Sequence, residues 1–377
     1  MLIFWGFIII IGSLYFILTG FIFTGWIRTR PYELQDGIDQ PTVSVIIPFR
    51  DDAAGLSFLL NDLADQNYSK SRFEVIVVDD HSANPKYVLP SELESGIRIR
   101  RLNLDNNEHG KRAALIKGLN ASDSELILTS DADCRVTPFW ITEMSNYYIS
   151  RKVKLVFGSV LYPDSKKMDE MLQSLEYLSL MAAGAGFAGN GYPIICSAAN
   201  MGFERTIYLE YIRDNKSSFP ISGDDVMFML WLKKRYFGQI GFIKSLNSVV
   251  ITKPTAGIKE FINQRLRWTS KSRYYRDPAI ILTASMVYLE SLLLLVLLVG
   301  SFFNGSMLKG FIILFLVKCI GDLVLLLIVT RYYRNRYLLL IFLPLEIIYF
   351  IYISIIGFAG NILSFDWKGR RSGSGKT

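Results

Sequence analysis

Apolar residues are concentrated at the two ends of the chain. Residues 2–27 form one uncharged apolar run, and residues 279–364 are apolar with two short polar interruptions. The region between them, residues 40–255, has the mixed composition of an ordinary globular domain. This segregation predicts a globular domain flanked by membrane-embedded segments.

The first apolar run is long enough to cross about 30 Å of hydrocarbon. A signal peptide is the competing interpretation, but the run lacks a basic start and a small-residue cleavage site. Trp5 and Trp26 stand near its ends, where membrane proteins place aromatic residues. Because Arg28 and Arg30 follow directly, the positive-inside tendency predicts Met1 outside and the globular domain in the cytoplasm.

Three more apolar stretches follow the globular region, at about 279–302, 310–330 and 337–363. Two crossings return the chain to the cytoplasm at the basic loop 331–336. A third crossing would place the basic tail of residues 365–377 outside, against the same tendency. Two alternatives therefore stay open for residues 337–363, namely a full span or a re-entrant element broken near Pro344.

The globular region contains short apolar runs separated by helical patterns. The runs that predict strands are 43–48, 73–78, 97–102 and 125–129, and the helical patterns between them are 53–67 and 111–119. Continuous β-branched runs are typical of strands buried on both faces of a parallel sheet. The alternation predicts a doubly wound α/β sheet, in which ligands bind at the carboxyl ends of the strands.

Acidic residues follow two of these predicted strands directly. Asp79 and Asp80 end the second strand, and Asp131 and Asp133 end the fourth. One alternative is that each acid caps a turn or a helix. Two acidic pairs at one edge of a sheet instead favour a site for Mg²⁺ or Mn²⁺, since hard cations prefer oxygen ligands and can bridge a diphosphate.

Charge and cysteine content narrow the class of protein. The 377 residues are 51% hydrophobic and carry a net charge of +7, and the basic residues cluster at 265–276 and 331–336, beside the apolar segments. This placement indicates an anionic membrane surface, and no nucleic-acid partner is expected because no nucleic-acid-binding motif occurs. Three widely spaced cysteines predict neither a disulfide framework nor a zinc knuckle, which fits a reducing compartment.

Several motifs occur in an order that is found in a known family. They are Pro48, Val77–Asp80, Gly110–Ala114, Asp131–Asp133, Gly223–Asp225 and Gln264–Trp268. Over residues 41–275 the chain resembles the inverting family 2 glycosyltransferases with a GT-A fold. More narrowly, it resembles membrane-integrated members with a Gln-x-x-Arg-Trp motif, such as ceramide glucosyltransferases and the cellulose, chitin and hyaluronan synthases. The expected fold class is an α/β GT-A domain, Rossmann-like with a mostly parallel sheet, flanked by transmembrane helices.

The resemblance implies roles on the donor side. Asp79 or Asp80 would hydrogen-bond the base of the nucleotide-sugar, expected to be the uracil of a UDP-sugar. Lys111 would lie against the diphosphate, where a cation is useful. Asp131 would position the donor sugar and ribose and could share the metal, and Asp133 would be the main ligand of Mg²⁺ or Mn²⁺.

The resemblance also assigns the acid–base chemistry. Asp225 matches the general base, a carboxylate that takes the proton of the acceptor hydroxyl as that hydroxyl attacks the anomeric carbon. Asp224 stands where the family usually has Glu, so its role as a second catalytic acid is less well defined. The alternative is that both acids cap a helix over residues 226–234.

Gln264, Arg267 and Trp268 would share one face of a helix over residues 258–273. The resemblance implies an arginine on the leaving diphosphate and a tryptophan platform for the acceptor sugar. The alternative is a basic amphipathic helix that lies on the membrane surface. The loop 199–205 resembles the acceptor side of the site, and Trp367–Arg370 resembles the tail of lipid-glycosylating members.

The expected domains follow the composition. They are a transmembrane helix at 1–28, a GT-A catalytic domain at 40–256, an interfacial helix at 257–277, a transmembrane region at 278–364 and a basic tail at 365–377.

The expected function is transfer of a sugar from a nucleotide-sugar to a membrane lipid or lipid-linked acceptor. The protein would be integral to a bacterial inner membrane, with its catalytic domain cytoplasmic and its oligomeric state open. A processive polysaccharide synthase is the main alternative, although three C-terminal segments make a sparse channel. A membrane scaffold with a retained GT-A fold, a nucleotidyltransferase and a transporter explain fewer of the motifs.

Overall fold

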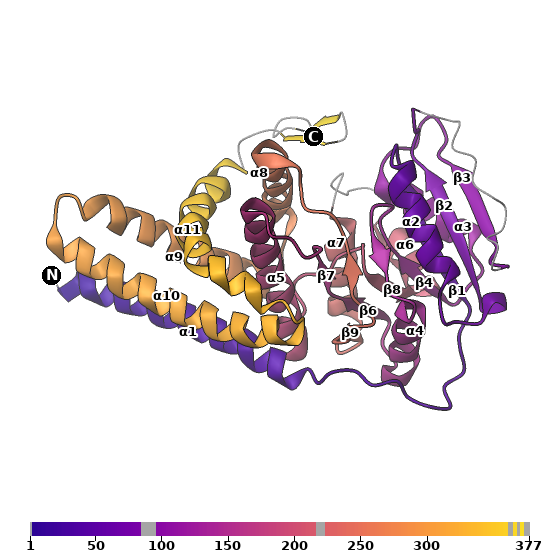
Figure 1. Cartoon of the computed structure of the whole chain (residues 1–377), viewed down its shortest axis with the longest axis horizontal. Helices are drawn as coiled ribbons and strands as arrows, with labels where there is room; N and C mark the ends of the chain where they lie inside the picture. Colours follow the sequence, from indigo (N-terminus) through magenta and orange to yellow (C-terminus); the bar gives the residue numbers. More distant parts are fainter. Residues whose placement is uncertain (1, 84–95, 216–222, 361–364, 368–369, 373–377) are drawn as a thin grey trace. The chain divides into compact units, whose positions relative to one another are not determined.

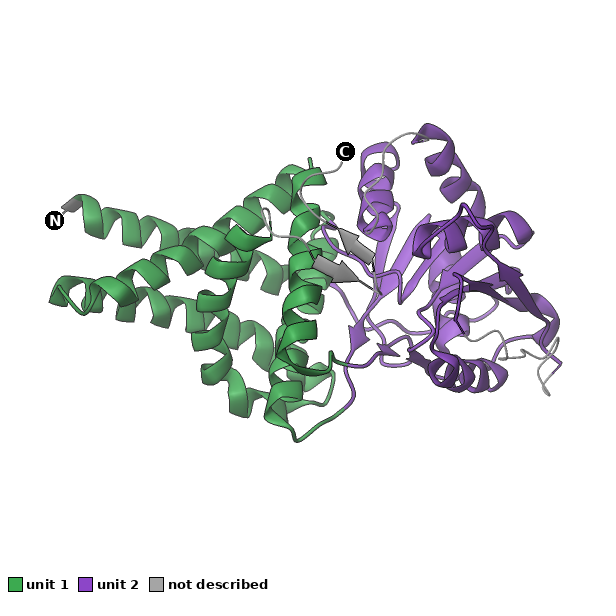
Figure 2. Ribbon diagram, turned by 90° about the horizontal axis from the view of Figure 1, so that it is seen from above, with its two compact units in different colours: residues 1–28, 164–192, 254–377 green, residues 29–163, 193–253 purple. Residues whose placement is uncertain are grey.

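The computed structural model describes residues 2–83, 96–215, 223–360, 365–367 and 370–372. The chain forms two compact units, shown in different colours in Figure 2. Unit 1 comprises residues 1–28, 164–192 and 254–377, and unit 2 comprises residues 29–163 and 193–253. Each unit is described by itself.

Unit 2 is built around a seven-stranded, mostly parallel sheet with the order β3-β2-β1-β4-β8-β6-β9 (Figure 1). In that order the strands are β3 (Ile99–Asn103), β2 (Phe73–Asp79), β1 (Val43–Phe49), β4 (Leu126–Thr129), β8 (Met201–Glu204), β6 (Leu155–Gly158) and β9 (Ile240–Ile243). The first four run parallel, β8 is antiparallel to both its neighbours, and β9 is parallel to β6. This arrangement confirms the predicted fold class.

The four predicted strands are observed within two residues of their expected bounds at each end, with their apolar side chains buried. Val43, Val45, Ile46 and Ile47 in β1 have no exposed surface. β1 is paired with a parallel strand on each side, and its side chains are buried on both faces of the sheet. Burial on both faces explains why its apolar residues are continuous and do not alternate with polar residues.

The helices of unit 2 are α2 (Ala53–Ala64), α3 (Lys111–Ala121), α4 (Trp140–Arg151), α6 (Arg205–Asp214) and α7 (Asp224–Arg235), with a short 3₁₀ turn η1 (Lys70–Arg72) before β2. A second, three-stranded sheet contains β5 (Arg135–Val136), β10 (Val250–Ile251) and β7 (Val160–Leu161). The helices α2, α3 and α7 match the predictions. The helices α4 and α6 and the small sheet were not predicted.

Unit 1 is mostly helical. Its elements are α1 (Leu2–Arg28), α5 (Met168–Gly189), α8 (Gly257–Thr269), η2 (Ser270–Tyr274), α9 (Pro278–Gly300), α10 (Gly305–Tyr332), η3 (Arg336–Ile341), α11 (Phe342–Ala359), β11 (Phe365–Trp367) and β12 (Arg370–Ser372). Among the described residues, four segments are long and apolar enough to cross a membrane: 3–28, 278–300, 305–332 and 336–359.

The helix α5 joins the membrane-type helices of unit 1, although it lies inside the range 40–256 that was expected to form the catalytic domain. It packs on α1 through small residues. A side-chain carbon on Gly186 would overlap the backbone of Ile22, and one on Gly25 would overlap the backbone of Gly186. Such close contact is typical of helices that associate through glycine.

The helices α1 and α10 run side by side in the same direction. Gly12 of α1 lies against Leu314, and near the other end the ring of Trp26 packs on those of Tyr332 and Tyr333, with centroids 5.7 and 5.9 Å apart. The aromatic cluster lies next to Arg28, the last residue of α1. Aromatic and basic residues at one end of membrane helices mark a membrane–water interface.

The segment η3–α11 begins and ends at the same end of the helix bundle. It starts directly after α10, and its middle residue Phe350 packs with Leu294 and Leu314. Its C-terminal Gly360 lies against Thr269, the last residue of α8, and Gly357 lies against Tyr288 of α9. The helices α8, α9 and α11 can be followed in Figure 1. Since α9 and α10 form an antiparallel hairpin, the end of α10 and the start of α9 lie at one end of the bundle.

The break expected near Pro344 is observed slightly earlier in the chain and not at the proline itself. The change from 3₁₀ to α geometry occurs between Ile341 and Phe342, and Pro344 stands in the first turn of α11. Proline is tolerated there because the first backbone N–H groups of a helix have no partner within the helix. The helix therefore continues through this proline.

A buried cluster of charges lies among the apolar helices. Lys318 of α10 forms ion pairs with Asp322, at 2.6 Å, and with Glu346 of α11. The hydroxyl of Tyr15 in α1 donates to Asp322 at 2.9 Å. Glu290 of α9 is fully buried. Ionisable residues within membrane helices usually face the bundle interior in this way.

The glycine contact between α1 and α5 predicts a sharp difference between two alanine substitutions. Gly186→Ala should destabilise the protein by about 1–3 kcal/mol, because the added carbon meets backbone atoms that cannot move aside. Gly20→Ala, at an exposed site of α1 with open space around it, should be neutral or slightly stabilising. Thermal unfolding of the purified proteins measures both, and equal midpoints would contradict the prediction.

Candidate active site

The loops that follow β1, β2 and β4 meet at one edge of the sheet, because these strands are parallel and adjacent. The register places Phe49 opposite Asp79 and Ile46 opposite Thr129. The predicted donor-site acids therefore lie on one rim, as the sequence indicated.

The loops after β1 and β2 are tied to each other. The backbone N–H of Asp51 donates to the Ser82 hydroxyl at 3.0 Å, and the N–H of Ala83 donates to Asp51 Oδ1 at 2.6 Å. Asp51 and His81 both have a φ of 58°, in the left-handed region. These hydrogen bonds hold the tight turn after β1 against the tight turn after β2.

Asp79 is firmly held. Its Oδ1 accepts from the Ser82 backbone N–H at 2.9 Å, and its Oδ2 accepts from Arg101 Nη2 at 2.8 Å. Asp80 is also buried, and its backbone N–H donates to the carbonyl of Phe49 at 2.8 Å. Both acids are thus fixed at the carboxyl end of β2.

Lys111 forms an ion pair with Asp131, which joins the start of α3 to the loop after β4. Gly110, the N-cap of α3, has a φ of 90° that favours glycine, and this turn brings the lysine to the rim. Burial alone would lower the pKa of Lys111, but the charges of Asp131 and Asp225 and the Asp131 hydrogen bond hold this pKa above its ordinary value. The lysine is therefore a permanent cation at the rim.

Asp133 lies in an environment that disfavours its charge. Burial, followed by the neighbouring charge of Asp131, raises the pKa of Asp133 above its ordinary value. Asp52 adds to this repulsion from the N-cap of α2, where it accepts from the Gly55 backbone N–H at 3.0 Å. Carboxylates that repel one another in this way fit a divalent cation, whose charge would offset the repulsion.

Asp225 reaches the same rim from α7. Its carboxylate accepts from the backbone N–H groups of Val226, at 2.9 Å, and Ala198, at 3.2 Å. The carbonyl of Ala198 in turn accepts from the hydroxyl of Thr129, the last residue of β4, at 2.7 Å. This chain of bonds ties Asp225 to the carboxyl end of β4.

Asp224 has a different environment from Asp225. It accepts from the hydroxyls of Tyr208 and, at 3.1 Å, Tyr211, and Arg112 Nε lies 3.1 Å from its Oδ1. Burial raises the pKa of Asp224, while these three partners act to lower it. Both of its oxygens are engaged within the protein.

The partners of Asp224 were missed in the sequence. Arg112 stands in the Gly-Lys-Arg motif but was given no role, and Tyr208 and Tyr211 lie on the unpredicted helix α6. Their spacing places both hydroxyls on one helix face. No local pattern pairs that face with an acid on another helix.

Gln264, Arg267 and Trp268 lie on α8, in unit 1, whereas the rim acids lie in unit 2. All three are partly exposed, and the predicted helix 258–273 is observed as α8 followed by the 3₁₀ turn η2. The motif tail Trp367–Arg370 includes residues 368 and 369, which lie outside the described residues.

Arg265, between the motif positions, is the residue that anchors α8. It forms a buried two-pronged ion pair with Glu176 of α5, with Nε 2.9 Å from Oε1. The hydroxyl of Tyr352 in α11 donates to the same carboxylate at 2.9 Å. The guanidinium also lies over the ring of Trp268, 4.3 Å from its centroid, and donates to Gln264. It therefore orders two of the three motif side chains.

Residues 44–212 match the model of the family Glycosyl transferase family 2. The matched region contains Asp79, Asp80, Lys111, Asp131 and Asp133. Asp225 and α8 lie outside it.

Curated relatives share parts of the chain. It is 27% identical over 142 residues to the glycosyltransferase AglE of Haloferax volcanii, covering 37% of this chain and 47% of the relative. It is 37% identical over 113 residues to an N-acetylglucosaminyltransferase of Bradyrhizobium elkanii, covering 28% and 61%. It is 31% identical over 108 residues to the undecaprenyl-phosphate 4-deoxy-4-formamido-L-arabinose transferase of Aeromonas hydrophila, covering 26% and 31%. The chain thus matches less than two thirds of the length of each.

Among solved structures, the chain resembles the mannosyltransferase PcManGT from Pyrobaculum calidifontis in complex with GDP-Man and Mn²⁺. The TM-score is 0.58 at 14% identity, over 93% of this chain and 97% of that one. This similarity shows a shared fold, the GT-A type.

The buried pair of Arg265 and Glu176 predicts a non-additive response to substitution. Glu176→Met leaves a buried arginine without its main partner and should cost about 3–5 kcal/mol. Adding Arg265→Met should recover most of that loss. Thermal unfolding of both variants measures the coupling.

Glu170→Met is the matched control, because Glu170 lies on the same helix and pairs with the exposed Lys167. This solvent-exposed pair should contribute little to stability, so Glu170→Met should leave the unfolding midpoint nearly unchanged. A double variant no more stable than Glu176→Met would contradict the proposed coupling.

Proposed function

We propose that this protein is an inverting glycosyltransferase that moves a sugar from a nucleotide-sugar to a membrane lipid or lipid-linked acceptor. The observation that carries this proposal is the single rim that holds Asp79, Asp80, Lys111, the Asp131–Asp133 pair and Asp225. All of these except Asp225 lie in the region that matches Glycosyl transferase family 2. The four apolar helices of the chain support a membrane location.

The donor is assigned to the carboxyl ends of β1, β2 and β4. Asp79 is already paired with Arg101, so it would fix the loop and accept from the base at the same time, while Asp80 beside it offers a second acceptor. A uracil N–H is the donor that such a carboxylate would recognise. UDP-sugars are therefore the first candidates, and the relatives named N-acetylglucosaminyltransferases make N-acetylglucosamine the first sugar to test.

Asp133, with Asp131, would hold Mg²⁺ or Mn²⁺. When bound, this ion supplies positive charge that neutralises the diphosphate of the leaving group. Lys111 adds a fixed positive charge beside the same phosphates. Its ion pair with Asp131 keeps the lysine in place before the donor arrives.

Asp225 would act as the general base. The backbone N–H groups of Ala198 and Val226 hold its carboxylate in one orientation, so that it can receive the proton of the acceptor hydroxyl. Asp224, whose oxygens are engaged with two tyrosines and Arg112, would position the start of α7 and not exchange protons.

On α8, Arg267 would contact the leaving diphosphate, Trp268 would support the acceptor sugar, and Gln264 would help to order the donor. Arg265 is a positioning residue for this set, since it contacts Gln264 and Trp268 and fixes α8 to α5. Its neighbour Glu176 completes that anchor.

A lipid acceptor agrees with the small number of apolar segments in the C-terminal part of the chain. The three C-terminal apolar segments leave little room for a polysaccharide channel, and one partial relative is named as an undecaprenyl-phosphate sugar transferase. A processive polysaccharide synthase is the second candidate, and a non-catalytic scaffold is the third. Product analysis separates all three.

We further propose that η3–α11 is re-entrant and that the catalytic domain is cytoplasmic. The segment begins after Tyr332 and Tyr333, which pack on Trp26, and its last turn lies against Tyr288 of α9 and Thr269 of α8. These contacts support a path that returns toward the side on which it began. A re-entrant path returns the basic tail to the cytoplasmic side, which removes the conflict with the positive-inside tendency.

Activity is tested by incubating the purified protein with radiolabelled UDP- and GDP-sugars and extracted bacterial lipids. Label should enter the organic phase, and chelation should abolish transfer until Mg²⁺ or Mn²⁺ is restored. Asp225→Asn should lower kcat by about 10²–10⁴-fold while the donor still binds. Asp133→Asn should lose metal-dependent transfer.

The control for these variants is Asp36→Asn, an exposed acid in the segment before β1, which should retain full activity. A high-molecular-weight aqueous product would replace the lipid proposal by polymer synthesis. Full activity of Asp225→Asn would refute the base assignment.

The re-entrant path is tested with a thiol reagent that does not cross membranes. The native Cys134, Cys196 and Cys319 are buried, so single cysteines can be introduced with little background. Thr377→Cys should react only in inside-out vesicles, and Phe303→Cys, 88% exposed between α9 and α10, should react only in right-side-out vesicles. Reaction of both from the same side would contradict the proposed topology.

A further inference from the structure

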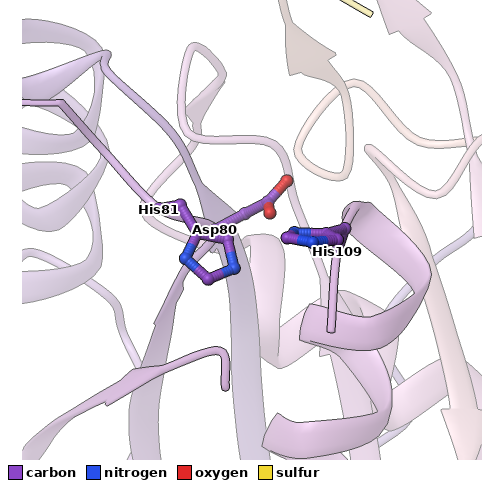
Figure 3. Close-up of side chains that lie close together, drawn as sticks. All are labelled: Asp80, His81 and His109. Atoms are coloured by element: carbon purple, nitrogen blue, oxygen red, sulfur yellow. The ribbon is translucent and has the colours of Figure 1, made fainter. Parts of the chain in front are cut away.

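The two histidines of this chain are brought together by the fold. His81 follows β2 directly, and His109 precedes the glycine that caps α3. Their ring centroids are 4.8 Å apart. Asp80 lies beside both, and one ligand atom from each of the three side chains falls within 4.8 Å of the others (Figure 3).

His81 is held in a defined orientation. Its backbone has a φ of 58°, and its Nε2 lies 2.9 Å from the backbone carbonyl of Glu108. Because a carbonyl can only accept, Nε2 donates in this contact, and in the neutral ring the lone pair then lies on Nδ1. Histidines that bind metals are commonly oriented by such a bond from the other ring nitrogen to a carbonyl.

We propose that Asp80, His81 and His109 form a binding site for one divalent transition-metal ion of the zinc class. Two imidazoles and one carboxylate are a ligand set that zinc accepts, and three protein ligands leave a fourth position open to water or another ligand. The ligand set differs in chemistry from the all-oxygen pair Asp131 and Asp133, which suits Mg²⁺ or Mn²⁺.

The burial of the three residues supports one ion at this place. Asp80 is only 8% exposed, while both histidines are exposed. The carboxylate therefore forms the buried floor of the site, and the imidazoles form its solvent-exposed side. An ion can therefore reach the imidazoles without unfolding of the rim.

One consequence rests on the proposed function. Asp80 is there an acceptor for the base of the donor, so an ion bound to Asp80 would compete with the nucleotide-sugar. The metal site would then act as an inhibitory site on the donor side of the rim.

Binding is tested on the full chain in detergent, purified through a tag that contains no histidine. Zn²⁺ is titrated by calorimetry and Co²⁺ by visible absorption, both with excess Mg²⁺ to occupy the oxygen-only pair. One equivalent of each ion should bind. His109→Gln should weaken the affinity at least about tenfold. His81→Asn should do the same, and asparagine tolerates the left-handed backbone at this position.

Two matched variants locate the ion. Glu108→Gln removes a neighbouring charge but none of the three ligands, so the zinc affinity should be unchanged. Asp133→Asn should likewise retain the site. The proposal is overturned if the wild-type protein binds no Zn²⁺, if the histidine variants bind as well as the wild type, or if Asp133→Asn abolishes binding.

Competition with UDP-sugar is measured separately. Zinc that binds through the two histidines but leaves donor binding unchanged would count against the role of Asp80 in base recognition. It would leave the metal site itself intact, so the two proposals can fail independently.

Discussion

The parallel pairing of β1, β2 and β4 places several carboxylates at one edge of the sheet, where they repel one another. Neighbouring basic side chains reduce most of this repulsion. Arg101 pairs with Asp79, Lys111 with Asp131, and Arg112 with Asp224. Asp133 is different, since burial and the charge of Asp131 hold its pKa above the ordinary value. The rim therefore keeps one carboxylate, that of Asp133, whose charged form is disfavoured by its surroundings.

Much of this rim could be predicted from local sequence. The β-branched runs gave the four parallel strands, and an acid directly after such a run can only stand at the strand exit. The small sheet and the antiparallel strand β8 could not be predicted in the same way. Their strands have two to four residues, and their pairing depends on partners far along the chain, such as Met201 with Thr129.

The residues that bind Asp224 and Arg265 also could not be predicted from the sequence. Asp224 is bonded to Tyr208 and Tyr211 on another helix, and Arg265 is bonded to Glu176, 89 residues away. Such pairs arise from the packing of helices, and no periodicity within either segment encodes them. The Gln-x-x-Arg-Trp resemblance singled out Gln264, Arg267 and Trp268 of α8, whereas the fold shows that Arg265, which lies between them, ties α8 to α5.

Pairing of buried charges also positions α11 against α10. A lysine and two acids inside apolar helices are tolerated only when they meet, because an unpaired charge there is costly. The contacts of Lys318 with Asp322 and Glu346 therefore fix the register of α11 against α10. Beyond this contact, Phe350 packs with Leu294 and Leu314, and Gly360 lies against Thr269. Paired buried charge thus helps to set how the first turns of α11 pack on α10.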